Sequence, residues 1–364
     1  MIKFALKRIA ASLLIVLGTT VLIYALLLAA PGGPEQKYAA NPKYTQAQVD
    51  NYVRALGLDK SALEQYCRWL GACRRDADLP ASLVGPTGLP SILPATFSGV
   101  DTGLLHGDLG YSISDGEPVV NRIGGALVPT LILATLSAVI WLTIAVILGV
   151  MTGLRNGGAI DNATSVLTYV TYSVPTFLLG FALIWVFAVV LDWLPVSGMT
   201  DARNMPTFGT EPFFELLRTD PLRVIGDLAS HLVLPTATLV IVSIAGDSRY
   251  VRQSIIEAMS MEHVRTARSK GLSERRINVR HILRTGLIPF ATNLGLAFPF
   301  LVGGALVTET IFAWPGIGRL TLIAIGNLDY PLLMGILTLG AFAVAIGNLI
   351  SDLLYAALDP RVTT

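Results

Sequence analysis

Few residues in this chain have the types and spacing that catalysis or metal binding requires. The four histidines are scattered, and none belongs to the His-Glu-x-x-His pair of a zinc hydrolase. None of the six lysines follows a glycine, so the sequence lacks the Gly-x-x-x-x-Gly-Lys loop that cradles nucleotide phosphates. We therefore expect no catalytic, cofactor-binding or metal-binding residue in this chain. Any site for a nucleotide must belong to a partner subunit.

The composition of the 364 residues indicates a membrane protein. Hydrophobic residues make up 53% of the chain and charged residues 14%, whereas an average soluble domain has about 25% charged residues. The mean hydropathy of +0.62 agrees with this interpretation. The net charge of +1 gives no sign of a nucleic-acid-binding surface. These values exclude an ordinary soluble enzyme.

Five uncharged apolar stretches are long enough to cross a membrane, which takes about 20 residues of helix, and a shorter sixth, 229–246, is interpreted as a span that continues to about Val251 with a charged cytoplasmic end. None has the alternating pattern of a lipid-facing barrel strand. We therefore predict an all-α membrane protein with six transmembrane helices, at about 9–30, 123–154, 162–191, 229–251, 285–308 and 330–354. The first stretch is longer than the apolar region of a usual signal peptide, so we favour an uncleaved helix over a cleaved leader.

The positions of lysine and arginine predict which loops face the cytoplasm. Three cations stand before the first helix: Lys3, Lys7 and Arg8. They place residues 1–8 in the cytoplasm and, after six crossings, the carboxyl terminus as well. The loop 252–284 would also be cytoplasmic, and together with Arg249 it carries nine cations against three acids. Residues 31–122 would form a large extracytoplasmic loop.

The outer loop holds the chain's two cysteines, Cys67 and Cys73. Residues 45–70 are expected to form short helices, and a disulfide can form on the oxidising side of a membrane. On one continuous helix the six-residue separation would hold the two thiols about 9 Å apart, whereas a turn at Gly71 would bring them together. The sequence leaves two alternatives open, a Cys67–Cys73 disulfide or two free thiols.

Polar residues inside predicted spans are candidates for the substrate path. Asn293, Asn348 and His231 are of this kind, although a packed or hydrogen-bonded role is the alternative for each. Asp247 and Asp352 stand near the cytoplasmic ends of their spans, where we expect structural pairing with arginines of the basic loop.

The basic loop has the local pattern of two helices separated by a turn. Residues 259–270 favour helix, and Gly271 would end that helix in a left-handed conformation. Ser273 then has N-cap chemistry, and the second helix would continue through Pro289 into the next span. A short cationic helix held off the membrane fits docking on another protein. The alternative is a basic loop that only contacts anionic lipid.

The segment from Glu262 to Arg276 resembles the cytoplasmic loop of permease subunits of dipeptide and oligopeptide ABC importers. The resemblance extends along the chain, in order, and is strongest to the B-type permease. Further tags of the family are Pro31-Gly-Gly-Pro34, Leu56-Gly-Leu-Asp59, Gly107-Asp-Leu-Gly-Tyr-Ser112, Leu194-Pro-Val-Ser-Gly198, Glu309-Thr-Ile-Phe-Ala-Trp-Pro-Gly-Ile-Gly-Arg319 and Asp329-Tyr-Pro331. The residues that the resemblance assigns to ATPase coupling are Glu262, His263, Val264, Arg265, Thr266, Ala267, Arg268, Lys270, Gly271 and Leu272.

The chain departs from the family pattern in two places. Arg265, Thr266 and Ala267 stand where the general importer pattern has Glu-Ala-Ala. The outer loop also carries an insertion near 72–106, on the side where a substrate-binding protein would dock.

The resemblance implies a complete transporter around this chain. It implies the type I ABC importer permease fold in the inner membrane of a prokaryote, a second homologous permease, and two ATP-binding subunits that hold ATP and Mg. It also implies an extracytoplasmic substrate-binding protein that delivers peptides. Relatives of this type also carry nickel chelates, glutathione or other small solutes, so these remain alternative substrates. A secondary transporter is disfavoured, because the two halves show no repeat.

Overall fold

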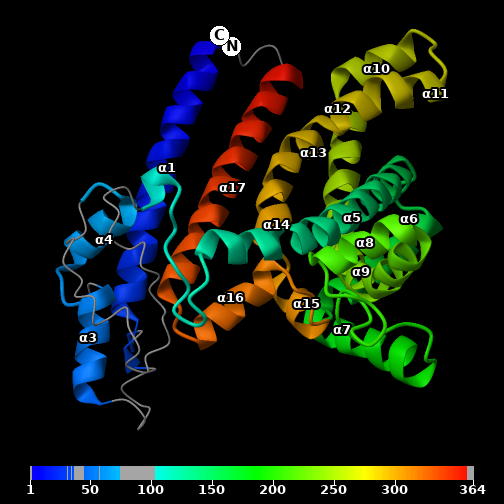
Figure 1. Cartoon of the computed structure of the whole chain (residues 1–364). Helices are drawn as coiled ribbons and strands as arrows, with labels where there is room; N and C mark the ends of the chain where they lie inside the picture. The colour runs from blue at the N-terminus through cyan, green and yellow to red at the C-terminus, as the bar shows by residue number, and fades with distance from the viewer. Residues whose placement is uncertain are drawn as a thin grey trace.

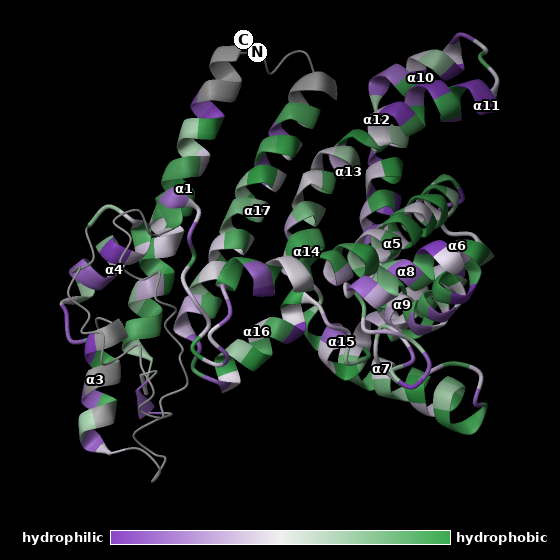
Figure 2. Ribbon diagram, in the orientation of Figure 1, coloured by the Kyte–Doolittle hydropathy of each residue, from purple (hydrophilic) through white to green (hydrophobic). Residues whose placement is uncertain are grey.

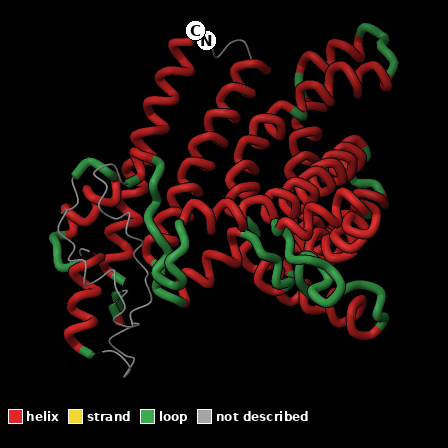
Figure 3. The backbone as a smooth tube through the Cα atoms, viewed as in Figure 1, coloured by secondary structure: helices red, strands yellow, loops and turns green. Residues whose placement is uncertain are grey.

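The computed structural model describes residues 2–30, 32–33, 35–36, 45–56, 58–73 and 103–358 of the chain. Within these ranges the protein consists of helices joined by loops, with one isolated bridge between Tyr111 and Pro118 (Figure 3). Most of the predicted insertion near 72–106 lies outside the described residues.

Four helices are long and apolar enough to cross a membrane. They are α1 (Ile2–Ala29), α5 (Val119–Leu154), α9 (Pro221–Ser260) and α17 (Tyr330–Leu358). They coincide with four of the six predicted spans. The main difference is α9, which has 40 residues and continues beyond the predicted span at both ends.

The span predicted over 162–191 is a bent pair of helices. α6 (Ala159–Ser173) and α7 (Thr176–Leu183) meet at 96°, and α7 continues as a π-helical segment, Ile184–Val190. The bend lies at Pro175, which disfavours helical backbone at the preceding residue. Val174 is accordingly extended, with ψ 123°.

The span predicted as one helix over 285–308 is a series of short segments. These are α12 (Arg284–Gly286), α13 (Ile288–Asn293), a 3-10 turn (Leu294–Ala297), α14 (Phe298–Gly303) and α15 (Leu306–Ile311). Pro289 and Pro299 stand in the first turns of α13 and α14, where proline removes no helical hydrogen bond. Gly304, with φ +76°, ends α14. The predicted span is thus divided into segments at these residues.

The centre of the bundle is the contact between α5 and α9. An added Cβ on Gly149 of α5 would lie 2.6 Å from the carbonyl oxygen of Ser248, and one on Gly153 would lie 3.1 Å from that of Arg252. Small residues four apart therefore let the two backbones approach closely. α1 and α17 lie side by side at one edge of the bundle, and α6 and α7 lie at the other (Figure 1).

The described part of the predicted outer loop nearest α1 forms two short helices beside it. α3 (Gln46–Leu56) and α4 (Ala62–Leu70) occupy the region where short helices are predicted. Two hydrogen bonds attach α4 to α1: the Tyr24 hydroxyl donates to Gln65 Oε1 over 2.8 Å, and the hydroxyls of Thr20 and Tyr66 are 2.9 Å apart.

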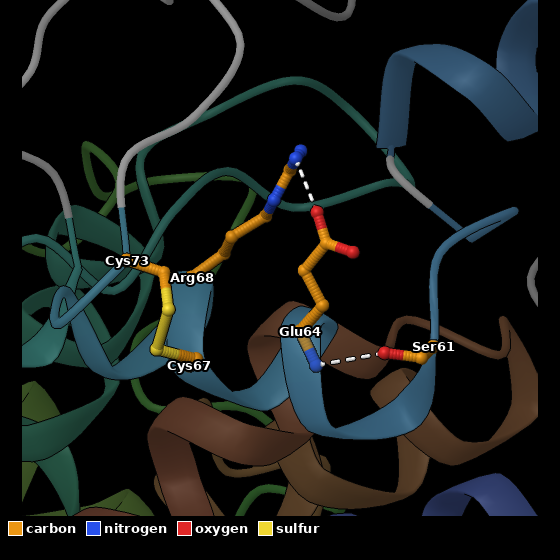
Figure 4. Close-up of a disulfide and its surroundings, with 5 residues drawn as sticks. All are labelled: Ser61, Glu64, Cys67, Arg68 and Cys73. Carbon is orange, nitrogen blue, oxygen red and sulfur yellow. Dashed lines mark hydrogen bonds and ion pairs between the residues drawn. A yellow bond between two sulfur atoms is a disulfide. The ribbon is translucent and has the colours of Figure 1, made fainter.

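The structure joins Cys67 and Cys73 in a disulfide (Figure 4). Gly71 ends α4 with φ +87°, and the chain turns back so that the two Cα atoms are 5.2 Å apart. At the other end of α4, Ser61 Oγ accepts the backbone N–H of Glu64, and the Glu64 carboxylate pairs with Arg68 at 2.7 Å. Of the two alternatives, a disulfide or two free thiols, the structure thus contains the disulfide, and the chain turns at Gly71 to form it.

Candidate functional site

The basic loop begins with a corner at the end of α9. α9 ends at Ser260, Met261 is extended (φ −69°, ψ 146°), and α10 covers Glu262–Ser269. The helix predicted over 259–270 is therefore divided, and its first two residues belong to α9. Residues on both sides of Met261 favour helix, so local propensity gave no sign of the corner.

Gly271 ends α10 as predicted. Its φ of +73° is left-handed, and an added Cβ would meet nothing within 4 Å, so the constraint is conformational rather than steric. The Gly271 N–H donates to the carbonyl of Arg268, and the Leu272 N–H donates to that of Ala267. This pair of bonds is the Schellman motif, which satisfies the last carbonyls of a helix.

α10 divides sharply into a buried and an exposed face. Val264 and Ala267 are 0% and 4% exposed, and they pack in one apolar cluster with Ile255, Ala258 and Ile277. The remaining positions face outward: Glu262, His263, Arg265, Thr266, Arg268, Ser269 and Lys270. Two small apolar side chains thus fix the helix to the end of α9, while its polar face stays open.

One ion pair, between Arg268 and Glu274, joins α10 to the helix that follows it. α11 (Glu274–Ile277) continues as a π-helical segment, Asn278–Leu283. Arg268 Nε and Nη2 donate to the two carboxylate oxygens of Glu274 at 2.9 and 3.3 Å. This hydrogen-bonded guanidinium lowers the pKa of Glu274. Ser273 stands at the predicted N-cap position, although its side chain makes no cap hydrogen bond.

The surface of this loop is strongly cationic. Figure 2 shows hydrophilic residues concentrated on α10 and α11, away from the apolar bundle. The exposed cations are Arg265, Arg268, Lys270, Arg275, Arg276, Arg280 and Arg284. Two exposed acids, Glu262 and Glu274, stand among them, and each pairs with an arginine. The face therefore suits an acidic or polar partner surface.

A buried ion pair connects the base of this loop to the neighbouring helices. Arg252 on α9 donates to both oxygens of Asp161 on α6, at 2.6 and 2.8 Å, and to Asn156 Oδ1 at 2.9 Å. Asp161 is 2% exposed. Arg252 therefore joins α9 to α6 and to the turn that follows α5.

The three path candidates lie on three different helices. His231 is buried on α9, and its Nδ1 lies 2.9 Å from the carbonyl oxygen of Asp227 in the same helix. Asn348 is exposed on α17. Asn293 ends α13, and its side chain lies outside the described residues. The contacts of His231 are those of a packed histidine, which was the alternative for this residue.

The two span aspartates have partners other than the predicted ones. Asp247 accepts a hydrogen bond of 3.0 Å from Trp141 Nε1 on α5 rather than pairing with an arginine of the basic loop. Asp352 pairs at 3.0 Å with Arg8 of α1. Only Asp247 is next to the basic loop in sequence, and helix packing directs both carboxylates to other partners.

Sequence reasoning missed two buried carboxylates, Glu309 and Asp329. Asp329 accepts from Ser112 Oγ at 2.5 Å and from the Ile113 N–H at 3.1 Å. Glu309 accepts from Thr130 Oγ1 at 2.9 Å and from the Arg319 N–H at 3.1 Å. The available signal was that all of these residues but Thr130 and Ile113 fall in the tags that carry the resemblance. These tags thus supply side chains that form hydrogen bonds between segments far apart in sequence.

The comparisons with known proteins decide the family. Residues 145–364 match the family described as binding-protein-dependent transport system inner membrane component, and residues 1–86 match its N-terminal region. The chain belongs to this family. This permease subunit is therefore a component of a transport system in the inner membrane and not an enzyme. The resemblance and the predicted localisation are confirmed.

Relatives of this permease subunit match it over almost its whole length. The oligopeptide transport system permease protein AppB of Bacillus subtilis is 32% identical over 363 residues, covering 100% of this chain and 99% of that protein. The probable peptide ABC transporter permease protein y4tP of Sinorhizobium fredii is 32% identical over 359 residues, with 99% and 98% covered. The dipeptide transport system permease protein DppB of Escherichia coli is 29% identical over 366 residues, with 100% and 99% covered.

Proposed function

We propose that this permease subunit is the B-type half of the membrane path in an ATP-driven importer of peptides. The names of the full-length relatives support the substrate class, and the exposed polar face of α10 carries the proposal of a docking partner. The alternatives are the same transporter with a nickel chelate, glutathione or another small solute, and a secondary transporter that works without ATP.

The proposed topology has six crossings and both termini in the cytoplasm. α1, α5, the bent α6–α7 pair, α9, the segmented stretch 284–311 and α17 would each cross once. A second, homologous permease would complete the path, and a substrate-binding protein would dock on the outer loops. This arrangement places α10 and its cations in the cytoplasm, in agreement with the positive-inside rule.

The proposed coupling site is the exposed face of α10 together with Gly271 and Leu272. Two ATP-binding subunits, which would hold ATP and Mg, would each receive a short helix of this kind. Because α10 is fixed to α9 through Val264 and Ala267, movement of the ATPases would move α9 and the helices paired with it.

The test is purification of the tagged permease after co-expression with its second permease and its ATP-binding subunits. We expect the ATPases to co-purify with the wild-type chain and to be lost with Gly271→Pro and Arg268→Glu. Arg218→Glu, an exposed arginine of α8 (Glu211–Thr219) on the proposed outer side, is the matched control and should retain them. Import of peptide by the chain without nucleotide and without an ATPase partner would show that the proposal is wrong.

A further inference from the structure

α6 has two chemically different faces, although its whole length lies in a proposed span. At 100° per residue, one side carries polar residues and the other carries apolar ones. The polar face consists of Asn162, Ser165, Thr168, Tyr169, Tyr172 and Ser173, and the apolar face consists of Ala163, Val166, Leu167 and Val170. Lipid can cover the apolar face, but the polar face is not suited to contact with lipid and is expected to face protein, water or a ligand.

Arg249 of α9 lies against the polar face of α6. Its guanidinium carbon is 4.8 Å from the ring centroid of Tyr169 and 4.8 Å from that of Tyr172. The Nε atom donates to the carbonyl oxygen of Ala245 at 2.8 Å. Among the residues that the structure describes, no carboxylate lies within ion-pair distance of Arg249. The cation is held by two aromatic faces and one carbonyl, and its charge is not neutralised.

The guanidinium points into the span rather than toward the cytoplasmic end of α9. Ala245 stands one turn nearer the outer end of the helix, so the side chain is directed that way. Tyr169 and Tyr172 stand eight and eleven residues after Asp161, which is about 12 and 16 Å along α6 from the buried ion pair. Both rings are more than half exposed, at 60% and 62%.

Arg249 itself stands near the cytoplasmic end of its proposed span, and a cation that points from there into the span requires either water or an anion beside it, because hydrocarbon solvates it poorly. We propose that Arg249, Tyr169 and Tyr172 form an anion site on the translocation path, which binds the carboxylate of a peptide in transit. The site rests on the proposed function. A guanidinium offers parallel N–H donors that match a carboxylate, and stacking between two rings holds its plane in place. The terminal carboxylate is present in every peptide, so a site for it is independent of side-chain sequence.

Two other anions fit the same chemistry and are outcomes of the test. An acidic residue of the second permease would bury the tyrosines at a subunit contact. An anionic lipid headgroup would occupy the site in the absence of peptide. Each outcome differs from the proposed one in the accessibility of the polar face and in its response to peptide.

The first experiment measures access to the polar face in the assembled transporter. Ser173→Cys provides a thiol on this face, and Ala163→Cys provides the matched thiol on the apolar face; the two native cysteines are already joined. In membrane vesicles, we expect a water-soluble maleimide to label Ser173→Cys and not Ala163→Cys. Millimolar tri-alanine should slow the labelling at least twofold, and tri-alanine amide should not. An unlabelled Ser173→Cys, or equal protection by both peptides, would overturn the proposal.

The second experiment measures ATP-dependent uptake of tri-alanine in proteoliposomes that contain the whole transporter and its binding protein. Arg249→Gln should lower uptake at limiting peptide by about tenfold or more, and Arg249→Lys should lower it less. Arg223→Gln, near the outer end of α9, is the control and should not change it. Tyr169→Phe should retain uptake and Tyr169→Ala should reduce it, because the ring face makes the contact.

The outcomes separate this site from the proposed function. Wild-type uptake together with unchanged Arg249→Gln uptake would overturn the site and leave the peptide importer intact. Loss of the second permease from the purified Arg249→Gln complex would assign Arg249 to the subunit contact and also overturn the site. Failure of the wild-type chain to purify with ATPases would instead contradict the proposed function.

Discussion

α4 and α10 are built by the same local code and are attached to the protein in different ways. Each is a helix of eight or nine residues that ends at a left-handed glycine, Gly71 or Gly271. α4 buries none of its residues and is held by a disulfide and by hydrogen bonds to α1. α10 is held by Val264 and Ala267, packed on α9. The covalent attachment fixes α4 at the surface, whereas the apolar attachment joins the proposed docking helix to a long apolar helix.

The largest expected effect comes from the apolar attachment. Val264→Asp should release α10 from α9, because an unpaired buried charge costs more than about 3 kcal/mol. We expect rapid proteolysis within residues 260–275 and loss of ATP-driven transport. Val279→Asp on the adjoining helix is the control, since Val279 is 60% exposed, and it should behave as wild type. Equal effects of the two variants would contradict the proposed attachment.

Loss of the disulfide should destabilise α4 and should not affect the binding of the ATPases. The double substitution Cys67→Ser and Cys73→Ser opens a short loop, for which chain entropy predicts a loss of about 2 kcal/mol. We expect faster amide hydrogen exchange in α4 with unchanged ATPase co-purification. Loss of the ATPases from this variant would contradict the claim that α10, and not α4, binds the ATPases.

Gly271 should stabilise the end of α10 only through its left-handed backbone conformation. Gly271→Ala should destabilise the end of α10 by about 1 kcal/mol, because space is available but the backbone angle is unfavourable. Gly271→Asn should recover part of this loss, since asparagine tolerates the left-handed region. Thermal unfolding of the purified chain would measure both, and identical values for the two variants would disprove the conformational explanation.

The smallest expected effect is the dependence of the α10–α11 junction on pH. The pKa of Glu274 is lower in the folded protein than its ordinary value of 4.5. The Arg268–Glu274 pair therefore stabilises the junction above that ordinary value and ceases to do so as the pH falls through the lowered pKa. Hydrogen exchange at the junction should show this small change between pH 7 and pH 4. Glu274→Gln should remove it, and persistence of the change in that variant would assign it to another group.

The features that could be predicted from the sequence are those that depend on residues adjacent in the chain. Gly271 as a stop and Ser273 as the next start follow from local backbone preferences, and both are found where they were predicted. Pro175 sets the position of the bend between α6 and α7, but the size of the angle, 96°, and the corner at Met261 depend on how distant helices pack. For the same reason the contacts of Asp247 with Trp141 and of Arg249 with Tyr169 could not be predicted, because in each case the partner lies on another helix.

The central claim is that α10 contacts an ATP-binding subunit while α4 does not. It is tested most directly by cross-linking in the intact transporter, from a single cysteine at Thr266 on the exposed face of α10 and from one at Leu63, which is 78% exposed on α4. The account predicts that Thr266→Cys cross-links to the ATPase, with a yield that changes on addition of ATP, and that Leu63→Cys does not. Absence of a cross-link from Thr266→Cys in a transporter that hydrolyses ATP and imports peptide would contradict it.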